Sequence, residues 1–270
     1  MLITGAAGGL GSTLASAFAE RGCNLILIDI NRVALEKLDA SLTDQKIKRR
    51  IFCIDLCNKD EIKSLSQKLS HSGETPDIII NNAGMTLQKS VESHSDADWQ
   101  KVFDLNFWST VHISRECLPA LKEKNGGHIV NLSSMAACYG IPSQSSYSSS
   151  KAAVRAFSES LRAELAGYNI GVSSIHPGAI KTDMMMATLK ESDDLEIAKK
   201  NLALAQRFGV SPEKAAQKII TAIMRNRAHC YIGLDAHLFR LFSKLAPNVL
   251  SRVFSRAYSK VSNVKPAGPA

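Results

Sequence analysis

The sequence of 270 residues contains no run of about 18 consecutive apolar residues, so no segment is expected to cross a membrane as a helix. Its first residues, MLITGAAGG, have neither a basic start nor a continuous apolar stretch, which argues against a signal peptide. No stretch rich in Pro, Gly and Ser divides the chain, and no internal repeat is visible. We therefore expect one domain that spans residues 1–270.

The six cysteines lack the spacing of a metal site. Only Cys53 and Cys57 lie close together, and neither a second close pair nor a nearby histidine accompanies them. Several of the others fall in apolar segments, where reduced thiols behave as small hydrophobic groups. The sequence predicts no metal ion and favours a cytoplasmic location.

The net charge of +8 is spread over the predicted helices, apart from a basic stripe near the C-terminus. No basic run interleaved with aromatic residues occurs, which argues against binding of nucleic acid. Hydrophobic residues make up 45% of the chain, so it can bury a large core without disulfides or metal.

Short apolar runs alternate with segments of helical periodicity along the chain. The expected strands are Leu2–Thr4, Asn24–Ile30, Arg50–Asp55, Asp77–Asn81, Gly127–Leu132, Gly171–His176 and His229–Gly233. The expected helices are Leu10–Arg21, Val33–Leu42, Lys59–Ser70, Asp98–Lys124, Tyr147–Leu165 and Pro212–Arg225. Runs such as LILIDI are apolar at successive positions, which is typical of strands covered on both faces. The alternation predicts a doubly wound α/β fold, with a parallel sheet of about seven strands and helices on both faces.

The first expected strand is short. Only Met1, Leu2 and Ile3 precede the first turn, whereas strands usually run about five or six residues. Two interpretations are open: either the chain is truncated at its start, or that end of the strand is incomplete.

A glycine-rich turn, TGAAGGLG, follows this strand at Thr4–Gly11. Glycines there allow a tight turn and let a pyrophosphate approach the backbone at the positive end of a helix. The pattern G-x-G-x-x-G is not met because Leu14 occupies the third glycine position, and the P-loop pattern fails because no lysine follows. Asp29 ends the second strand about 20 residues after Gly9, where an acid would bond the adenosine ribose. A helix N-cap is the alternative role for this acid, and Asn31 could serve as the cap equally well.

Tyr147 and Lys151 lie four residues apart in YSSSK, which puts them on one face of a helix. A free tyrosine has a pKa near ~10, too high for a base at neutral pH. A nearby cation favours the phenolate and lowers that pKa, which would suit general acid–base catalysis. The alternative is the start of an amphipathic helix with a half-buried tyrosine and a solvated lysine.

Five motifs occur together: TGAAGGLG, NNAG at Asn81–Gly84, Ser134, YSSSK and HPGAIKT. In this order, up to about Thr182, the chain resembles the short-chain dehydrogenase/reductase family, whose T-G-x-x-x-G-x-G turn explains the failed template. The resemblance implies a Rossmann fold and an NAD(P)-dependent oxidoreductase that interconverts an alcohol and a ketone or aldehyde. A non-catalytic dinucleotide-binding protein that senses redox state is the alternative.

The resemblance also implies a catalytic set, whose completeness argues against the non-catalytic alternative. Tyr147 would be the acid/base, and Lys151 would bind the nicotinamide ribose and lower the pKa of the tyrosine. Ser134, rather than Ser133, has the family's spacing to the tyrosine and would hold the substrate oxygen. Asn106 matches a helix asparagine that keeps a water in a proton relay; a solvated or locally bonded asparagine is its alternative.

The cofactor positions implied by the resemblance follow the ends of the strands. The matches are Gly5, Gly9, Leu10 and Gly11 for the pyrophosphate, Asp29 for the ribose, Asp55 and Leu56 for the adenine, Asn82, Ala83 and Gly84 after the fourth strand, and Pro177, Gly178, Ile180 and Thr182 for the nicotinamide carboxamide. The alternative for NNAG is a turn that only stabilises the strand, and His176 receives no role. We expect NAD rather than NADP, because a 2′-phosphate would meet the carboxylate of Asp29, although Arg32 could soften this preference.

Beyond Thr182 the resemblance assigns no residues. We expect a substrate lid over 183–210, with Met184, Met185 and Met186, and a C-terminal amphipathic helical tail over 236–261. Arg252, Arg256 and Lys260 repeat along one face of this tail, which could pack on the core or on a neighbouring subunit. The sharper hypothesis is an apolar mouth for a lipid-like substrate, with peripheral membrane contact. A membrane-surface module would explain only the tail. The family commonly forms homodimers or homotetramers through the helices matching Asp98–Lys124 and Tyr147–Leu165.

Overall fold

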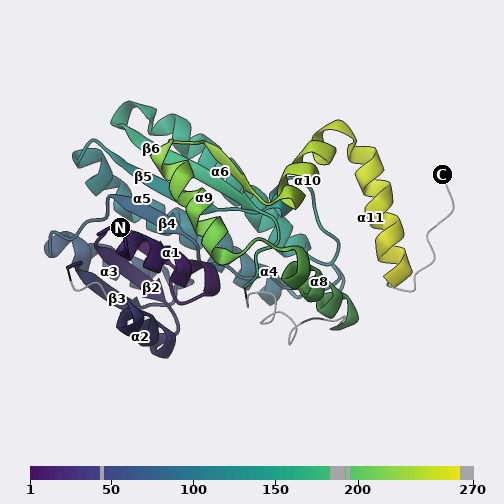
Figure 1. Ribbon diagram of the computed structural model, residues 1–270, viewed down its shortest axis with the longest axis horizontal. Coiled ribbons are helices and arrows are strands. Elements are labelled where there is room, and N and C mark those ends of the chain that lie inside the picture. Colours follow the sequence, from purple (N-terminus) through teal and green to yellow (C-terminus); the bar gives the residue numbers. More distant parts are fainter. Residues whose placement is uncertain (43–45, 183–191, 193–194, 262–270) are drawn as a thin grey trace.

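The structure is a computed structural model that describes residues 1–42, 46–182, 192 and 195–261. Seven strands form one sheet in the order β3-β2-β1-β4-β5-β6-β7, and every neighbouring pair is parallel (Figure 1). The strands are β1 (Leu2–Thr4), β2 (Leu25–Asp29), β3 (Arg49–Cys53), β4 (Ile78–Asn81), β5 (Gly127–Leu132), β6 (Ile170–Pro177) and β7 (His229–Ile232). The sheet confirms the predicted doubly wound α/β fold.

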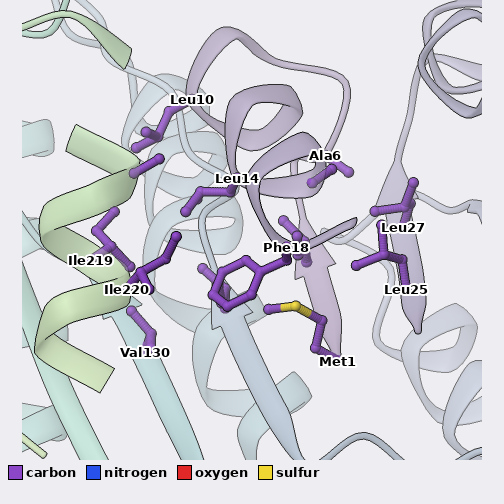
Figure 2. Close-up of a cluster of buried hydrophobic side chains, with 14 of the residues drawn as sticks. Met1, Ala6, Leu10, Leu14, Phe18, Leu25, Leu27, Val130, Ile219 and Ile220 are labelled. Atoms are coloured by element: carbon purple, nitrogen blue, oxygen red, sulfur yellow. The ribbon is translucent and has the colours of Figure 1, made fainter. Parts of the chain in front are cut away.

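Helices cover both faces of the sheet. One face carries α1 (Gly9–Ala19), α2 (Arg32–Ser41) and α9 (Pro212–Met224), and the other carries α3 (Lys59–His71), α5 (Ser109–Glu123) and α6 (Ser145–Glu164). Figure 2 shows the first interface, where Leu14 and Phe18 of α1 lie beside Ile219 and Ile220 of α9. Alternate residues of each strand point to opposite faces, so the central strands β1, β2 and β4 are apolar at successive positions up to their last residue.

The helix predicted over Asp98–Lys124 is not continuous. It consists of α4 (Asp96–Phe103), a π-helical turn at Asp104–Trp108, and α5. Such π-helical turns often occur at functional sites. The contacts of Asn106, which lies within this turn, account for the irregularity and are described below.

Several boundaries differ from the predicted ones by a few residues. Helix α6 begins at Ser145, two residues before Tyr147, so the tyrosine lies in its first turn. Strand β3 ends at Cys53, which leaves Asp55 in the loop that follows. Strand β1 has three residues, and the amino group of Met1 donates to the carbonyl oxygen of Asn24 at 2.7 Å.

In its described residues, the C-terminal third contains α8 (Leu195–Phe208), α10 (Leu234–Leu245) and α11 (Pro247–Val261) besides α9. The expected lid over 183–210 therefore contains α8, whereas Met184, Met185 and Met186 lie outside the described residues. In Figure 1, α10 and α11 extend outward at one end of the fold. None of the helices in the described part of the chain has the length and apolar character needed to span a bilayer.

Candidate active site

The predicted site residues gather at the carboxyl edge of the sheet. Strands β1 and β4 are neighbours there, although the chain passes from β1 to β2 on the opposite side. This reversal of strand order is the point at which open α/β sheets bind ligands. The loops that meet at this edge follow β1, β4, β5 and β6.

The glycine turn after β1 and the loop after β4 are joined by hydrogen bonds. The hydroxyl oxygen of Thr4 accepts from the backbone N–H groups of Asn82 and Ala83, both at 3.0 Å. The Asn82 amide donates to the carbonyl oxygens of Thr4 and Gly5, at 3.0 and 3.1 Å. The NNAG motif thus holds the glycine turn in place. Thr4, to which sequence reasoning gave no role, is the common acceptor, and its position at the head of the turn motif was the available signal.

Two glycines of the turn are required by close contacts within the protein. Gly5 has φ +60°, and a Cβ at this position would lie 2.9 Å from Ala83 Cα. Gly11 is buried, and a Cβ there would collide with the carbonyl oxygen of Gly5. Gly11 therefore allows α1 to pack against the turn, while Gly9 remains exposed toward the site.

The geometry at the start of α1 fits a dinucleotide. The helix begins after Gly8 with no side-chain cap and no acidic residue in its first turn, which leaves N–H groups for an anion. A Cβ on Gly9 would lie 3.0 Å from Thr182 Cγ2, so the loop after β6 faces the glycine turn. A Cβ on Gly84 would lie 3.1 Å from both Lys151 Nζ and Asn106 Oδ1. Glycine at both positions lets these segments approach one another closely.

Asp29 contacts the glycine turn directly. Its Oδ2 accepts from the Ala7 N–H and its Oδ1 from the Asn31 N–H, both at 3.0 Å. The N-cap of α2 is Asn31, whose side chain accepts from Ala34 N. Asp29 is therefore not the N-cap of α2, which was its alternative role.

The two residues expected beside the adenine differ in exposure. Asp55 is half-buried, and its Oδ1 accepts from the Cys57 N–H at 2.9 Å. The Leu56 side chain is 5% exposed and belongs to the hydrophobic core, so only its backbone remains for a ligand.

The Ser134 side chain lies near the phenol of Tyr147 and influences its pKa. Ser134 Oγ accepts a hydrogen bond from the Ala136 N–H at 3.1 Å. The neighbouring Ser133 instead donates to the carbonyl oxygen of Lys151 at 2.9 Å. Burial raises the pKa of Tyr147 above its ordinary value, and the nearby Ser134 side chain opposes this rise.

Lys151 is buried one helical turn beyond Tyr147. Its Nζ lies 5.9 Å from the centroid of the Tyr147 ring and donates to the carbonyl oxygen of Leu132 at 2.8 Å. Burial lowers the pKa of the ammonium to about 8, because the charged form loses hydration. Burial and the Ser134 side chain, rather than the ammonium, determine the pKa of Tyr147 in this structure. The expected lowering by Lys151 therefore stays a prediction for the loaded enzyme.

Asn106 is fully buried and its side chain is locked. Its Oδ1 accepts from Met85 N at 2.8 Å, while its Nδ2 donates to Met85 O at 2.9 Å and to Ser150 Oγ at 3.0 Å. These bonds tie the π-helical turn to the loop after β4 and to α6. The asparagine is therefore not solvated, and it positions the helix that carries Tyr147 and Lys151.

The loop after β6 is fixed by a residue that sequence reasoning missed. Asp235, in the first turn of α10, accepts through Oδ2 from the Ala179 N–H at 2.8 Å. A Cβ on Gly178 would collide with this carboxylate, which explains the glycine there. The available signal was an acid at a predicted strand end followed by an apolar helical pattern.

His176 has a structural environment. It is buried, and its ring stacks on Tyr231 with centroids 4.6 Å apart. Burial is the main reason why its pKa falls to about 3. In the described ranges of the chain, no group of three or more His, Cys, Asp or Glu is arranged to hold a metal ion.

The chain is similar to known proteins in both sequence and structure. A family model described as short chain dehydrogenase matches residues 1–193. The chain is 31% identical over 271 residues to a protein of Drosophila melanogaster named dehydrogenase/reductase SDR family protein 7-like, covering 98% of this chain and 82% of that protein. It is 31% identical over 263 residues to a fatty acyl-CoA reductase of Acinetobacter baylyi, covering 96% and 83%. The structure of a short-chain dehydrogenase/reductase from Burkholderia phymatum in complex with NAD superposes with a TM-score of 0.78 at 25% identity, covering 100% and 96%.

These likenesses and the geometry at the sheet edge define a class of enzyme: an oxidoreductase that uses NAD(P) and acts on alcohols and carbonyl compounds. Within that class, the chain belongs to the short-chain dehydrogenase/reductase family.

Proposed function

We propose that the enzyme interconverts an apolar alcohol and its ketone or aldehyde, with Tyr147 as the acid/base and NAD as the preferred cofactor. The observation that carries this proposal is the placement of Ser134 near the Tyr147 phenol, with the buried Lys151 ammonium 5.9 Å from the centroid of the same ring. These three groups provide a proton carrier, a partner for a substrate oxygen and a fixed cation in one place.

Each residue has a defined task in the proposed reaction. During oxidation Tyr147 takes the proton of the substrate hydroxyl, and during reduction it returns a proton to the carbonyl oxygen. Ser134 holds that oxygen through a hydrogen bond. Nicotinamide, when bound, accepts or supplies the hydride. Lys151 favours the phenolate electrostatically, and Asn106 maintains the position of α6 through its bonds to Met85 and Ser150.

The preference for NAD rests on Asp29. Its carboxylate is bonded to the Ala7 and Asn31 N–H groups, which fixes a negative charge against the glycine turn. Like charges about 4 Å apart repel by roughly 1 kcal/mol in water and by several times more where water is scarce. The nearby Arg32 could offset this repulsion of a 2′-phosphate. Its Nη1 instead lies 3.8 Å from Glu36 Oε1, in an exposed ion pair on α2.

The apolar substrate is supported by the surroundings of the loop between Ser134 and Tyr147. Tyr139 in this loop contacts Phe239 of α10 and Phe254 of α11, with ring centroids 6.5 and 5.8 Å apart. Phe208, at the end of α8, is 70% exposed. The similarity to a protein named fatty acyl-CoA reductase also supports an apolar substrate. The C-terminal helices and α8 would thus border an apolar mouth.

Three further parts of the proposal concern organisation. We propose one domain over residues 1–270 and a homodimer or homotetramer through the α4–α5 segment and α6, where the Trp108 indole is 44% exposed. A cytoplasmic location is consistent with six free thiols. A non-catalytic redox sensor would need no acid/base set, so the grouping of Ser134, Tyr147 and Lys151 favours the enzyme.

A substrate screen tests the proposed function. Primary and secondary alcohols, and the corresponding aldehydes and ketones, are offered with NAD(H) and NADP(H) while the absorbance of the reduced cofactor is followed. The proposal expects turnover of apolar substrates, at higher efficiency with NAD(H). Turnover confined to polar polyols would contradict the apolar mouth, and no turnover at all would return the redox sensor as the better account.

A further inference from the structure

Each of the two C-terminal helices exposes several apolar side chains to solvent. Their exposed apolar side chains are between 45% and 75% exposed and recur at helical spacing: Leu234, Leu238, Leu241, Phe242, Leu245, Val249 and Val253. Single exposed apolar residues are ordinary, but a row of them on adjacent helices marks an interaction surface.

The opposite sides of these helices are already occupied. Phe239 and Phe254 lie 5.9 Å apart by ring centroid, and both contact Tyr139 in the loop between Ser134 and Tyr147. Arg240 lies over the Tyr231 ring at 4.5 Å from its centroid. The α10–α11 pair is therefore attached to the active-site loop by one face, and it leaves the apolar row turned outward.

Apart from Asp235, the charged side chains of α10 and α11 in the described part of the chain are basic. Lys244, Arg252 and Arg256 are exposed on these helices. The acid in the described part of the pair is Asp235, whose carboxylate accepts from the Ala179 and Ala236 N–H groups. An apolar row with a basic margin has the composition of helices that lie in the interface of an anionic bilayer.

We propose that the α10–α11 pair docks onto an anionic lipid bilayer and thereby brings the active-site loop to the membrane surface. The inference deepens the proposed function, since it names a bilayer as the source of the apolar substrate. A second copy of the chain fits the face less well, because a two-fold contact would set basic margins against each other. Anionic headgroups complement the same margins, while the exposed leucines enter the headgroup boundary.

Vesicle sedimentation tests the docking without substrate or cofactor. The full chain is mixed with vesicles of phosphatidylcholine and phosphatidylserine, or of phosphatidylcholine alone, at low and high salt. We expect the chain to bind the anionic vesicles, and high salt should weaken this binding. Binding to the neutral vesicles should be weaker than binding to the anionic ones. The pairs Leu241→Ser with Leu245→Ser, and Arg252→Glu with Arg256→Glu, should each weaken binding by about tenfold or more.

Matched controls separate this surface from general properties of the chain. The exposed apolar residues Val33 and Met224 become serine in one control, and the exposed Lys63 and Lys214 become glutamate in the other. Both controls should bind as the unaltered chain does, and all four pairs should retain turnover of a short soluble alcohol.

Absence of vesicle binding by the unaltered chain would overturn the docking proposal, as would equal losses in the controls. A dimer in light scattering that the leucine pair abolishes, without vesicle binding, would assign the face to a second copy and overturn it as well. Specific vesicle binding by a chain that turns over no alcohol would support docking and count against the proposed function alone.

Discussion

The backbone N–H of Ala179 donates to Asp235 Oδ2 at 2.8 Å, and this bond fastens the loop after β6 to the first turn of α10. The same carboxylate accepts from the Ala236 N–H at 2.9 Å through Oδ1. Gly178 and Gly233 both adjoin the carboxylate so closely that a Cβ on either would collide with it. The loop that the family resemblance assigns to nicotinamide is therefore joined to the C-terminal helices by one side chain.

Replacing Asp235 tests this joint. Asp235→Ala should weaken NADH binding by about fivefold, which corresponds to loss of one hydrogen bond of about 1 kcal/mol. Asp235→Asn keeps an acceptor and should restore most of the affinity. Asp60→Ala, which removes an acid from the first turn of α3, serves as the control and should bind NADH normally. Equal affinities for the Ala variant and the unaltered chain would show that the loop does not depend on Asp235.

Asp29 should determine the choice between the two cofactors. We expect the dissociation constant of NADPH to exceed that of NADH by at least about tenfold, because a 2′-phosphate would meet the fixed carboxylate. Asp29→Ser should narrow the gap, whereas Asp60→Ser makes the same charge change elsewhere and should not. Comparable dissociation constants for the two cofactors in the unaltered chain would contradict this assignment.

Buried His128 should make the protein less stable in acid. Its Nε2 lies 2.8 Å from Ser173 Oγ, which donates its own proton to Arg227 O, so the neutral ring carries its proton on Nε2. Burial lowers the pKa of His128 to about 4, and the Arg162 cation adds to this. Between pH 6.5 and about 4 the unfolded chain thus binds a proton that the folded chain does not. The free energy of unfolding therefore decreases as the pH is lowered through this window.

Urea unfolding at a series of pH values measures this effect. One proton taken up only on unfolding corresponds to about 1.4 kcal/mol per pH unit. His128→Gln should reduce the slope below pH 6.5 by about that amount and leave the dependence at higher pH as it was. An unchanged acid slope would mean that the folded chain already protonates His128.

Substrate length tests the apolar mouth. Efficiency, kcat/KM, should rise along a series of primary alcohols, by at most about fourfold for each buried methylene worth ~0.8 kcal/mol. Truncation after Pro247 removes Phe254 and should weaken the binding of long substrates more than the binding of short ones. Equal efficiency for short polar and long apolar alcohols would refute the apolar mouth.

Much of the fold followed from pattern alone. Strands such as β2 and β4 are apolar at every position before their last residue, and helices such as α3 and α9 have strong periodicity with polar caps at Asn58 and Ser211. These signals are local, so they survive without knowledge of the rest of the chain. The π-helical turn was not predicted, because it depends on the bonds of Asn106 to Met85 and Ser150, far apart in the sequence.

The candidate site shows the same division. Tyr147, Lys151 and Ser134 were found from spacing and family resemblance, and the structure brings them together. The supporting contacts of Thr4, Ser133 and Asp235 were missed, since each joins a side chain to a backbone group of another segment of the chain. A single sequence carries no record of such pairings.

The most direct measurement of the central claim is the turnover of Tyr147→Phe beside its affinity for NADH. The variant keeps the ring and loses the proton carrier, so kcat should fall by at least ~10²–10⁴ while NADH binding survives. Tyr168→Phe, a change at an exposed tyrosine, should leave both quantities intact, and Lys151→Ala should weaken NADH binding as well as turnover. Near-normal turnover by Tyr147→Phe would contradict the assignment of this tyrosine as the acid/base.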